Sequence, residues 1–380
     1  MKSKIMKHKF LYAVLGLIII LVFVGVTVVA ANWNRPLSQG LELPTHVITA
    51  TLEATEVGNG QVEELALETP VVESIPTDAL EGIEIAPTPT ILPTDQPTPE
   101  PMCGGPMVMT ILGIGVDTSD DEYFYGLADV VRIARIDFVT PKVSVLAIPR
   151  DIWVKIPRIS DHYGITEGKL NQAYFYGTKA MGYYDGPGAG PGLMSLTLVE
   201  NFGLYVDKYG TVNMSTLARM IDAVGGIDIY VPESVDGREQ GLGFFSAGQQ
   251  HFTGEEAIRF SRIRYQDSDI QRIDRQTQVL YALQDKVLSP SVLPRIPKII
   301  ASFRDSIITD LSPKDISNLT CLLPHIRRDN LVYTRLPEHL LTPKWRIEPH
   351  SEKETWTWDW DYEAIRRLIG YYQSGNWPVK

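Results

Sequence analysis

The 380-residue sequence predicts an α/β protein: a single domain with a central mixed β-sheet flanked by helices, preceded by a transmembrane helix and a disordered linker. Three observations lead to this prediction. Residues 10–31 carry no charge, residues 32–106 are acidic and end in a run rich in proline and threonine, and residues 107–340 alternate strand-like with helix-like segments. Such alternation is typical of a layered α/β domain.

The N-terminus predicts a signal anchor. A cleavable signal peptide has an apolar region of about 7–15 residues, whereas the run from Phe10 to Ala31 has 22. At about 1.5 Å per residue this run can cross a hydrocarbon core of about 30 Å. The ending VVAAN leaves cleavage open as an alternative. The four lysines of residues 1–9 predict a cytoplasmic tail, a single membrane pass and an extracytoplasmic C-terminal domain.

Residues 32–106 predict a tether. They hold twelve acidic residues against one arginine, and alternating proline and threonine favour an extended chain. A disulfide between Cys103 and Cys321 would tie this tether to the domain, so we expect none. The formal net charge is −11, and the domain itself is net negative. A negative domain outside the membrane argues against nucleic acid as a partner.

Within the domain, Val- and Ile-rich runs predict strands at 107–116, 127–138 and 143–157, with shorter ones at 205–212 and 330–337. Helical spacing marks 169–181 and 190–203, and residues 213–233 predict a helix followed by a strand. From Thr253 the pattern is mostly helical, at 253–263, 269–288, 294–307 and 312–323. Residues 341–380 predict a C-terminal extension, a last helix packed on the domain by its tryptophans.

The sequence lacks a GxxxxGK[ST] phosphate loop, a GxSxG elbow and an HExxH motif, which leaves carboxylates, arginines and amides to carry chemistry. Asp117 ends one strand, Asp129 begins the next, and Arg150 follows a buried one. The stretch SRIRYQDSDIQRIDRQTQ adds further candidates: Arg262, Arg264, Asp269, Arg272, Arg275 and Gln276. Arg272 and Gln276 are four residues apart on one helix face.

Each of these residues alone is more often a turn residue or part of a solvated ion pair. Together they predict a pyrophosphate site. Strand-end residues of an α/β sheet converge on its ligand crevice, arginines suit bidentate phosphate contacts, and carboxylates suit a hard cation such as Mg²⁺.

The order of these segments resembles the LytR-CpsA-Psr family of bacterial cell-envelope proteins over residues 108–336. The matching segments are LGIGVD, the aspartate of LADVV, VSVLAIPRDIWVKIP, KLNQAYFYG, DAVGGIDIYVPE, TGEEAIRFSRIRYQDSDIQRIDRQTQVL and SIITDLSPKDI. The resemblance implies a catalytic domain at 107–340 with Mg²⁺, or Mn²⁺, as cofactor. It also implies transfer of a glycopolymer from a polyprenyl-pyrophosphate carrier onto peptidoglycan, with membrane lipid as a further partner.

Residue by residue, the resemblance implies that Asp117 and Asp129 hold the metal. It implies pyrophosphate contacts for Arg150, Arg262, Arg264, Arg272, Arg275 and Gln276. The catalytic residues it implies are Arg150, Asp129 and Asp269, either carboxylate being able to accept the proton of the acceptor hydroxyl.

Leu127 departs from the pattern, because the family commonly has arginine two residues before the second aspartate. No basic residue follows Asp117 closely either, and Arg132 and Arg135 on the next strand are the candidates to compensate. Two alternatives to the transferase therefore stay open. One is a non-catalytic or regulatory envelope protein that binds lipid-linked polymer, and the other is a hydrolase of the same pyrophosphate.

Overall fold

The computed structural model describes residues 32–41, 43, 99–118, 123–264 and 269–378, with the side chain of Asp269 excepted. The cytoplasmic tail (1–9), the membrane anchor (10–31) and most of the linker expected from the sequence lie outside these residues. Among the helices of the described ranges, none combines the length and the apolar character that a membrane span needs.

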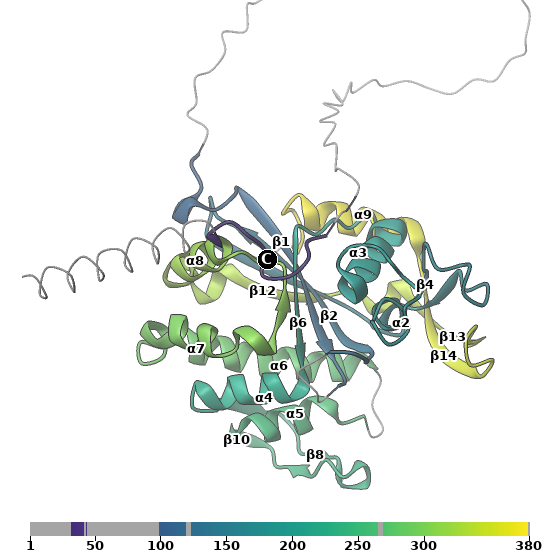
Figure 1. Cartoon of the computed structure of the whole chain (residues 1–380). Helices are drawn as coiled ribbons and strands as arrows, with labels where there is room; N and C mark the ends of the chain where they lie inside the picture. The colour runs from purple at the N-terminus through teal and green to yellow at the C-terminus, as the bar shows by residue number, and fades with distance from the viewer. Residues whose placement is uncertain (1–31, 42, 44–98, 119–122, 265–268, 379–380) are drawn as a thin grey trace, which may run out of the picture. The chain divides into compact units, whose positions relative to one another are not determined.

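A six-stranded mixed sheet forms the centre of the domain (Figure 1). In spatial order its strands are β11 (Ile308–Thr309), β6 (Lys208–Asn213), β1 (Val108–Val116), β2 (Ala128–Asp137), β3 (Lys142–Ile148) and β12 (Leu331–Arg335). β1 runs parallel to β6 and antiparallel to β2, and β12 runs parallel to β3. The predicted mixed sheet is confirmed.

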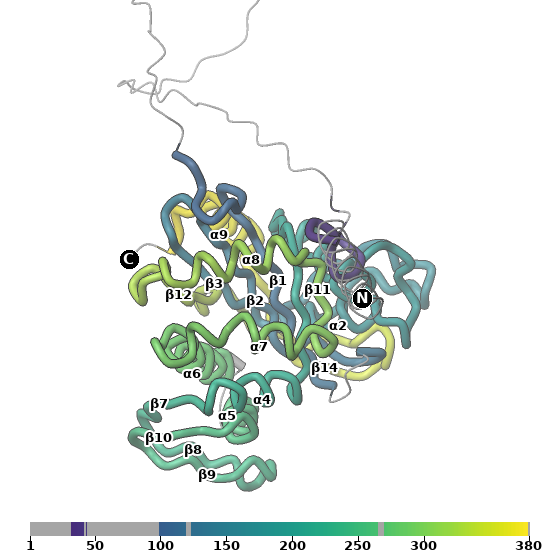
Figure 2. Tube along the Cα trace, turned by 60° about the vertical axis from the view of Figure 1, so that its left-hand side comes forward, coloured from purple at the N-terminus to yellow at the C-terminus, as the bar shows by residue number. Residues whose placement is uncertain are grey.

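Helices cover both faces of this sheet, because successive side chains of a strand point to opposite sides. Leu112, Ile114 and Ile133 pack in one core with α2 (Leu170–Tyr176), α3 (Ala189–Phe202) and α9 (Tyr362–Gln373). Met109 and Ile136 point to the other face, against α8 (Pro313–Leu322). Figure 2 shows α7 (Ile296–Ser302) and α8 in front of the strands and α6 (Asp269–Val287) beside them.

A second core lies between α4 (Met214–Ala223), α5 (Gly254–Arg262), α6 and the hairpin of β7 (Ile227–Val231) with β10 (Gly248–Phe252). α5 begins with a capping box, in which Thr253 and Glu256 each bond the other's backbone N–H. The predicted helices of this region are confirmed, and α5 ends at Arg262 while α6 begins at Asp269, as the sequence pattern indicates. Two short pairs, β4 (Trp153–Lys155) with β5 (Glu167–Lys169) and β8 (Val235–Asp236) with β9 (Phe244–Phe245), complete the strands before the C-terminal extension.

The C-terminal extension is a hairpin followed by a helix. The last helix, α9, is confirmed, but the tryptophan-rich run before it is the strand β14 (Glu354–Trp360), paired with β13 (Leu341–Ile347). Trp356, Trp358 and Trp360 alternate with polar residues, the period of a strand rather than a helix. Trp358 N donates to Asp151 O at 3.0 Å, which ties the hairpin to the chain after β3.

The expectation of unpaired cysteines is wrong, because Cys103 and Cys321 form a disulfide with Cα atoms 5.8 Å apart. Residues 102–104 are a short 3₁₀ helix on the domain, not free tether. Met102 N donates to Phe138 O, and Asn318 Nδ2 donates to Gly104 O. This arrangement places Cys103 beside α8.

Residues 32–41 and 43 also lie on the domain. Lys314 N donates to Trp33 O, Leu37 N donates to Leu311 O, and Tyr209 Oη donates to Gln39 O. Both described ends of the expected tether therefore belong to the folded unit.

Candidate functional site

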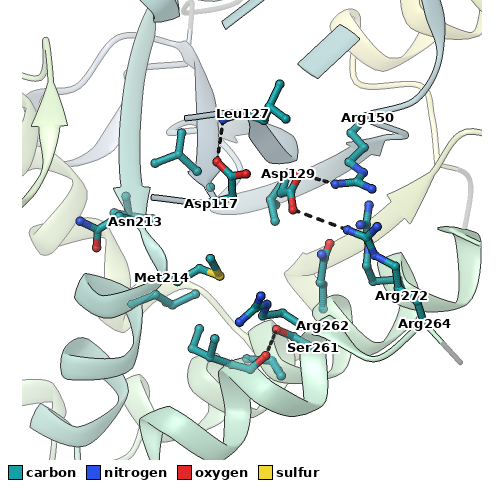
Figure 3. Close-up of a pocket in the computed structure, with 18 of the residues that line it drawn as sticks. Asp117, Leu127, Asp129, Arg150, Asn213, Met214, Ser261, Arg262, Arg264 and Arg272 are labelled. Atoms are coloured by element: carbon teal, nitrogen blue, oxygen red, sulfur yellow. Dashed lines mark hydrogen bonds and ion pairs between the residues drawn. The ribbon is translucent and has the colours of Figure 1, made fainter. Parts of the chain in front are cut away.

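A cavity of about 520 Å³ opens where the ends of β1 and β2 face α4, α5 and α6. Seven of the residues expected at the site line it: Asp117, Asp129, Arg150, Arg262, Arg264, Arg272 and Gln276. Figure 3 shows Asp117 and Asp129 beside each other, with Arg150, Arg264 and Arg272 gathered on one side of Asp129. Arg275 is not among the lining residues, and α6 begins at Asp269, whose side chain is not described.

The backbone of Leu127 fixes the two aspartates. Leu127 O accepts from Asp117 N at 3.1 Å and from Asp129 N at 3.0 Å, and Leu127 N donates to Asp117 Oδ1 at 2.7 Å. Beside this loop, Gly115 lets β1 pair with β2, because a Cβ there would lie 2.9 Å from the Cβ of its cross-strand partner Val130. Burial raises the pKa of the Asp117 carboxyl and the charge of Asp129 raises it further, against the opposing hydrogen bond from Leu127.

Arg150 joins two carboxylates. Its Nη1 donates to Asp129 Oδ1, and its Nε donates to Asp151 Oδ2 at 3.1 Å. Lys169 Nζ also donates to Asp151, at 3.0 Å. Burial alone would raise the pKa of Asp151, but Arg150 and Lys169 outweigh it and hold that pKa below its usual value. Asp151 and Lys169 therefore orient Arg150, a role that the sequence interpretation did not assign to either residue.

Two further arginines come from the end of α5: Arg262 is its last residue, and Arg264 follows two residues later. Arg264 Nη2 lies 3.7 Å from Asp129 Oδ2, and Arg264 N donates to Gln240 Oε1 at 3.1 Å. Arg275 is buried and donates through Nη2 to Ile263 O, the residue between Arg262 and Arg264. Its phosphate contact stays a prediction, while this bond fixes the backbone that carries the other two arginines.

Arg132 and Arg135 differ in their relation to the site. Arg132 Nη2 donates to Gln276 Oε1 at 3.4 Å and to Ile273 O at 3.2 Å, so it orients the cavity-lining amide. Burial lowers the pKa of Arg132 to about 10. Arg135 points to the opposite face of the sheet and donates through Nε to Gln373 O at 3.0 Å. Of the two, only Arg132 therefore contacts a cavity-lining residue, and it does not line the cavity itself.

The rest of the cavity lining is largely apolar. Its side chains come from the sheet and from α4, α5 and α6: Val116, Val130, Val212, Met214, Leu217, Ile258, Val279 and Leu280. One cavity thus joins a cluster of arginines and carboxylates to an apolar wall. Such a lining suits an amphipathic ligand with an anionic head and an apolar tail.

Asp117 and Asp129 are the carboxylates that fit a divalent cation. Each raises the energy of the other's negative charge, as the effect of Asp129 on the pKa of Asp117 indicates, and a cation would relieve that repulsion. In the part of the chain that the structure describes, no three acidic, histidine or cysteine residues gather as a complete metal site. Two carboxylates with the remaining positions left to water and phosphate oxygens is the arrangement that Mg²⁺ favours.

Comparison with known proteins identifies the family. The LytR_cpsA_psr family model matches residues 104–359. The chain belongs to the LytR-CpsA-Psr family. One relative, the polyisoprenyl-teichoic acid–peptidoglycan teichoic acid transferase TagU of Oceanobacillus iheyensis, is 33% identical over 61% of this chain and 67% of its own length. The corresponding transferase TagV of Bacillus subtilis is 32% identical over 53% of this chain and 49% of its own length.

A solved structure carries the same fold. The crystal structure of Bacillus subtilis TagV superimposes with a TM-score of 0.54 at 24% identity, covering 70% of this chain and 97% of that one. The LytR-CpsA-Psr fold thus accounts for the mixed sheet and its flanking helices. The sequence matches span about half to two thirds of the relatives' lengths.

Proposed function

We propose that this LytR-CpsA-Psr protein is a membrane-anchored extracytoplasmic phosphotransferase. It moves a glycopolymer from a polyprenyl-pyrophosphate carrier onto peptidoglycan. The observation that carries the proposal is the single cavity that joins Arg150, Arg264, Arg272 and two aspartates to an apolar wall. The names of TagU and TagV, which specify a polyisoprenyl-linked donor and a peptidoglycan acceptor, support it.

Phosphoryl transfer requires alignment and charge neutralisation more than covalent help from the protein. Arg150, Arg264 and Arg272 line the cavity and take up the negative charge that grows on the leaving polyprenyl phosphate. Asp151 keeps the Arg150 guanidinium directed at the cavity through its bond to Nε. The apolar side chains of α4 and α6 hold the polyprenyl tail and exclude water from it.

Mg²⁺, or Mn²⁺, bound by Asp117 and Asp129 would supply further positive charge at the phosphates. Asp129 lines the cavity and is held in place by Arg150, which makes it a candidate acceptor for the proton of the acceptor hydroxyl. Asp269 stays the second candidate, at the first residue of α6. Asp269→Asn tests the second candidate, since loss of the base alone lowers kcat without weakening donor binding, whereas Asp129→Asn would also remove a metal ligand.

The test uses the full-length protein in detergent with a lipid-pyrophosphate glycan donor and a peptidoglycan oligomer. We expect polyprenyl phosphate to be released together with formation of a glycan–peptidoglycan product, and both to stop when Mg²⁺ is chelated. Release without the acceptor would make the protein a hydrolase. Donor binding without release would make it a binding or regulatory protein.

Membrane placement is tested separately. The test fuses to residue 380 a reporter enzyme that is active only outside the cytoplasm. We expect this fusion to be active, because the predicted topology has the N-terminus inside and the C-terminal domain outside. A cytoplasmic C-terminus would contradict both the anchor and the access to peptidoglycan.

A further inference from the structure

A second cleft, of about 330 Å³, lies at the C-terminal hairpin. Its lining comes from β4, β5, the end of α3, the β13–β14 hairpin and the start of α9. Its lining includes Trp153, Glu167, Glu200, Arg346, Trp360 and Tyr362. None of its described lining residues is shared with the cavity at Asp117 and Asp129.

Two aromatic rings stand side by side in this cleft. The ring centroids of Trp360 and Tyr362 lie 5.2 Å apart with their planes tilted by 34°. Trp360 is fixed, because its Nε1 donates to Trp153 O at 2.8 Å and its ring packs on Phe202 with centroids 4.8 Å apart. Tyr362 is 53% exposed. Rigid aromatic rings that stay accessible are typical of recognition surfaces.

The same cleft offers both hydrogen-bond donors and hydrogen-bond acceptors. Lys155 is exposed at the cleft and supplies a donor, and Arg346 lines the cleft with its Cζ 5.1 Å from the centroid of the Trp153 ring. Glu167 and Glu200 are exposed at the cleft and supply acceptors. The ligand therefore presents both acceptors and donors beside an apolar face.

A sugar chain has this chemistry, since a pyranose carries hydroxyl groups at its edge and C–H groups on its face. We propose that this cleft binds the glycan strand of the peptidoglycan acceptor; the inference rests on the transferase function proposed above. The charges separate this occupant from the donor polymer. Asp359 is paired with Arg346 and Lys344, and the exposed carboxylates Glu167 and Glu200 outnumber Lys155, so the cleft offers a polyanionic, phosphate-rich donor no net positive charge.

The backbone connects the cleft to the catalytic cavity. Trp153 follows Arg150 by three residues, so their Cα atoms lie at most about 10 Å apart. Asp151 lies between them, bonding Arg150 through its carboxylate and Trp358 N through its carbonyl. A glycan strand seated on the hairpin is thus held on the same short segment that orients Arg150, within reach of the reacting phosphate.

The closing experiment measures binding of peptide-free peptidoglycan glycan strands to the full-length protein in detergent, by calorimetry. Tyr362→Ala is expected to weaken binding roughly tenfold, the effect of losing about 1.4 kcal/mol, and Glu200→Gln to weaken it in the same direction. Tyr371→Ala is the matched control, because Tyr371 lies on the same helix and is 52% exposed. No binding by the wild type, or equal loss in Tyr371→Ala, would overturn the proposal.

Steady-state transfer separates this inference from the proposed function. Tyr362→Ala is expected to raise the KM for the acceptor and to leave donor binding unchanged. If transfer proceeds and the acceptor KM does not rise, the glycan cleft is wrong and the transferase stands. If the wild type binds glycan strands and releases no polyprenyl phosphate, the transferase is wrong and the cleft is supported.

Discussion

Asp151 gives the sharpest test of how the site is built. It is 6% exposed and accepts from Arg150 Nε at 3.1 Å and from Lys169 Nζ at 3.0 Å. Asp151→Asn removes the charge that both cations face while keeping the size of the side chain. Leaving buried charges without their partner costs about 3 kcal/mol, which lowers the Tm of a domain this large by roughly 6–12 °C.

The same substitution is expected to lower kcat about 100-fold, the effect of losing one oriented electrostatic donor, because Arg150 is no longer held toward Asp129. The measurements are thermal unfolding and acceptor-dependent release of polyprenyl phosphate. Asp161→Asn serves as control. The Asp161 side chain is 78% exposed, and its ion pair with His162, at 3.7 Å, is a long one at the surface. Wild-type Tm and rate in Asp151→Asn would refute the idea that this carboxylate orients Arg150.

The stability effect also depends on pH. The folded protein holds the pKa of Asp151 below its unfolded value, so its contribution is present above the unfolded pKa and is lost as pH falls through the folded one. The difference in unfolding free energy between wild type and Asp151→Asn is therefore expected to shrink on acidification. A difference that stays constant down to the folded pKa would contradict this assignment.

Three further predictions concern other parts of the chain. Leu127→Arg places an arginine at the cavity and is expected to tighten donor binding about tenfold, the gain from one charge-assisted hydrogen bond; unchanged affinity would refute the idea that Leu127 leaves the site short of positive charge. Because burial and Asp129 raise the pKa of Asp117, Mg²⁺ binding to the protein alone is expected to weaken on acidification at a higher pH than an ordinary aspartate would require, and titration calorimetry showing no such dependence would argue against Asp117 as a ligand. Replacing both Cys103 and Cys321 with serine is expected to cost about 2–5 kcal/mol of unfolding free energy, measured by urea denaturation, and an unchanged midpoint would mean that the disulfide contributes nothing.

The elements and site residues that could be predicted are those with a local signal. β1 to β3 show Val- and Ile-rich runs, α4 to α6 show helical spacing, and seven site residues belong to contiguous motifs. The contacts that complete the site have no such signal. Leu127 acts through its backbone, which every residue possesses, and Arg132 meets Gln276 only because α6 packs on β2.

The hairpin of β13 and β14 differs from the predicted single helix for another reason. Its period-2 tryptophans are a strand signal, but the helical spacing directly after them favours one helix over both segments. The error matters for function, since Trp360 lies in that strand and lines the proposed glycan cleft. Here the alternation of aromatic and polar residues predicts the secondary structure better than the helical pattern of the residues that follow.

The expected tether shows where composition misleads. Proline, threonine and acidic residues predict an extended chain up to residue 106, but the last residues of the run form a 3₁₀ helix that is disulfide-bonded to α8. Residues 32–41 bond the turn before α8 and the first turn of α8 itself. Because the chain meets the domain at Trp33 and again at Met102, the length of residues 45–98 does not set the distance from residue 32 to the catalytic cavity. An anchor ending at residue 31 would therefore reach the domain without passing through residues 45–98.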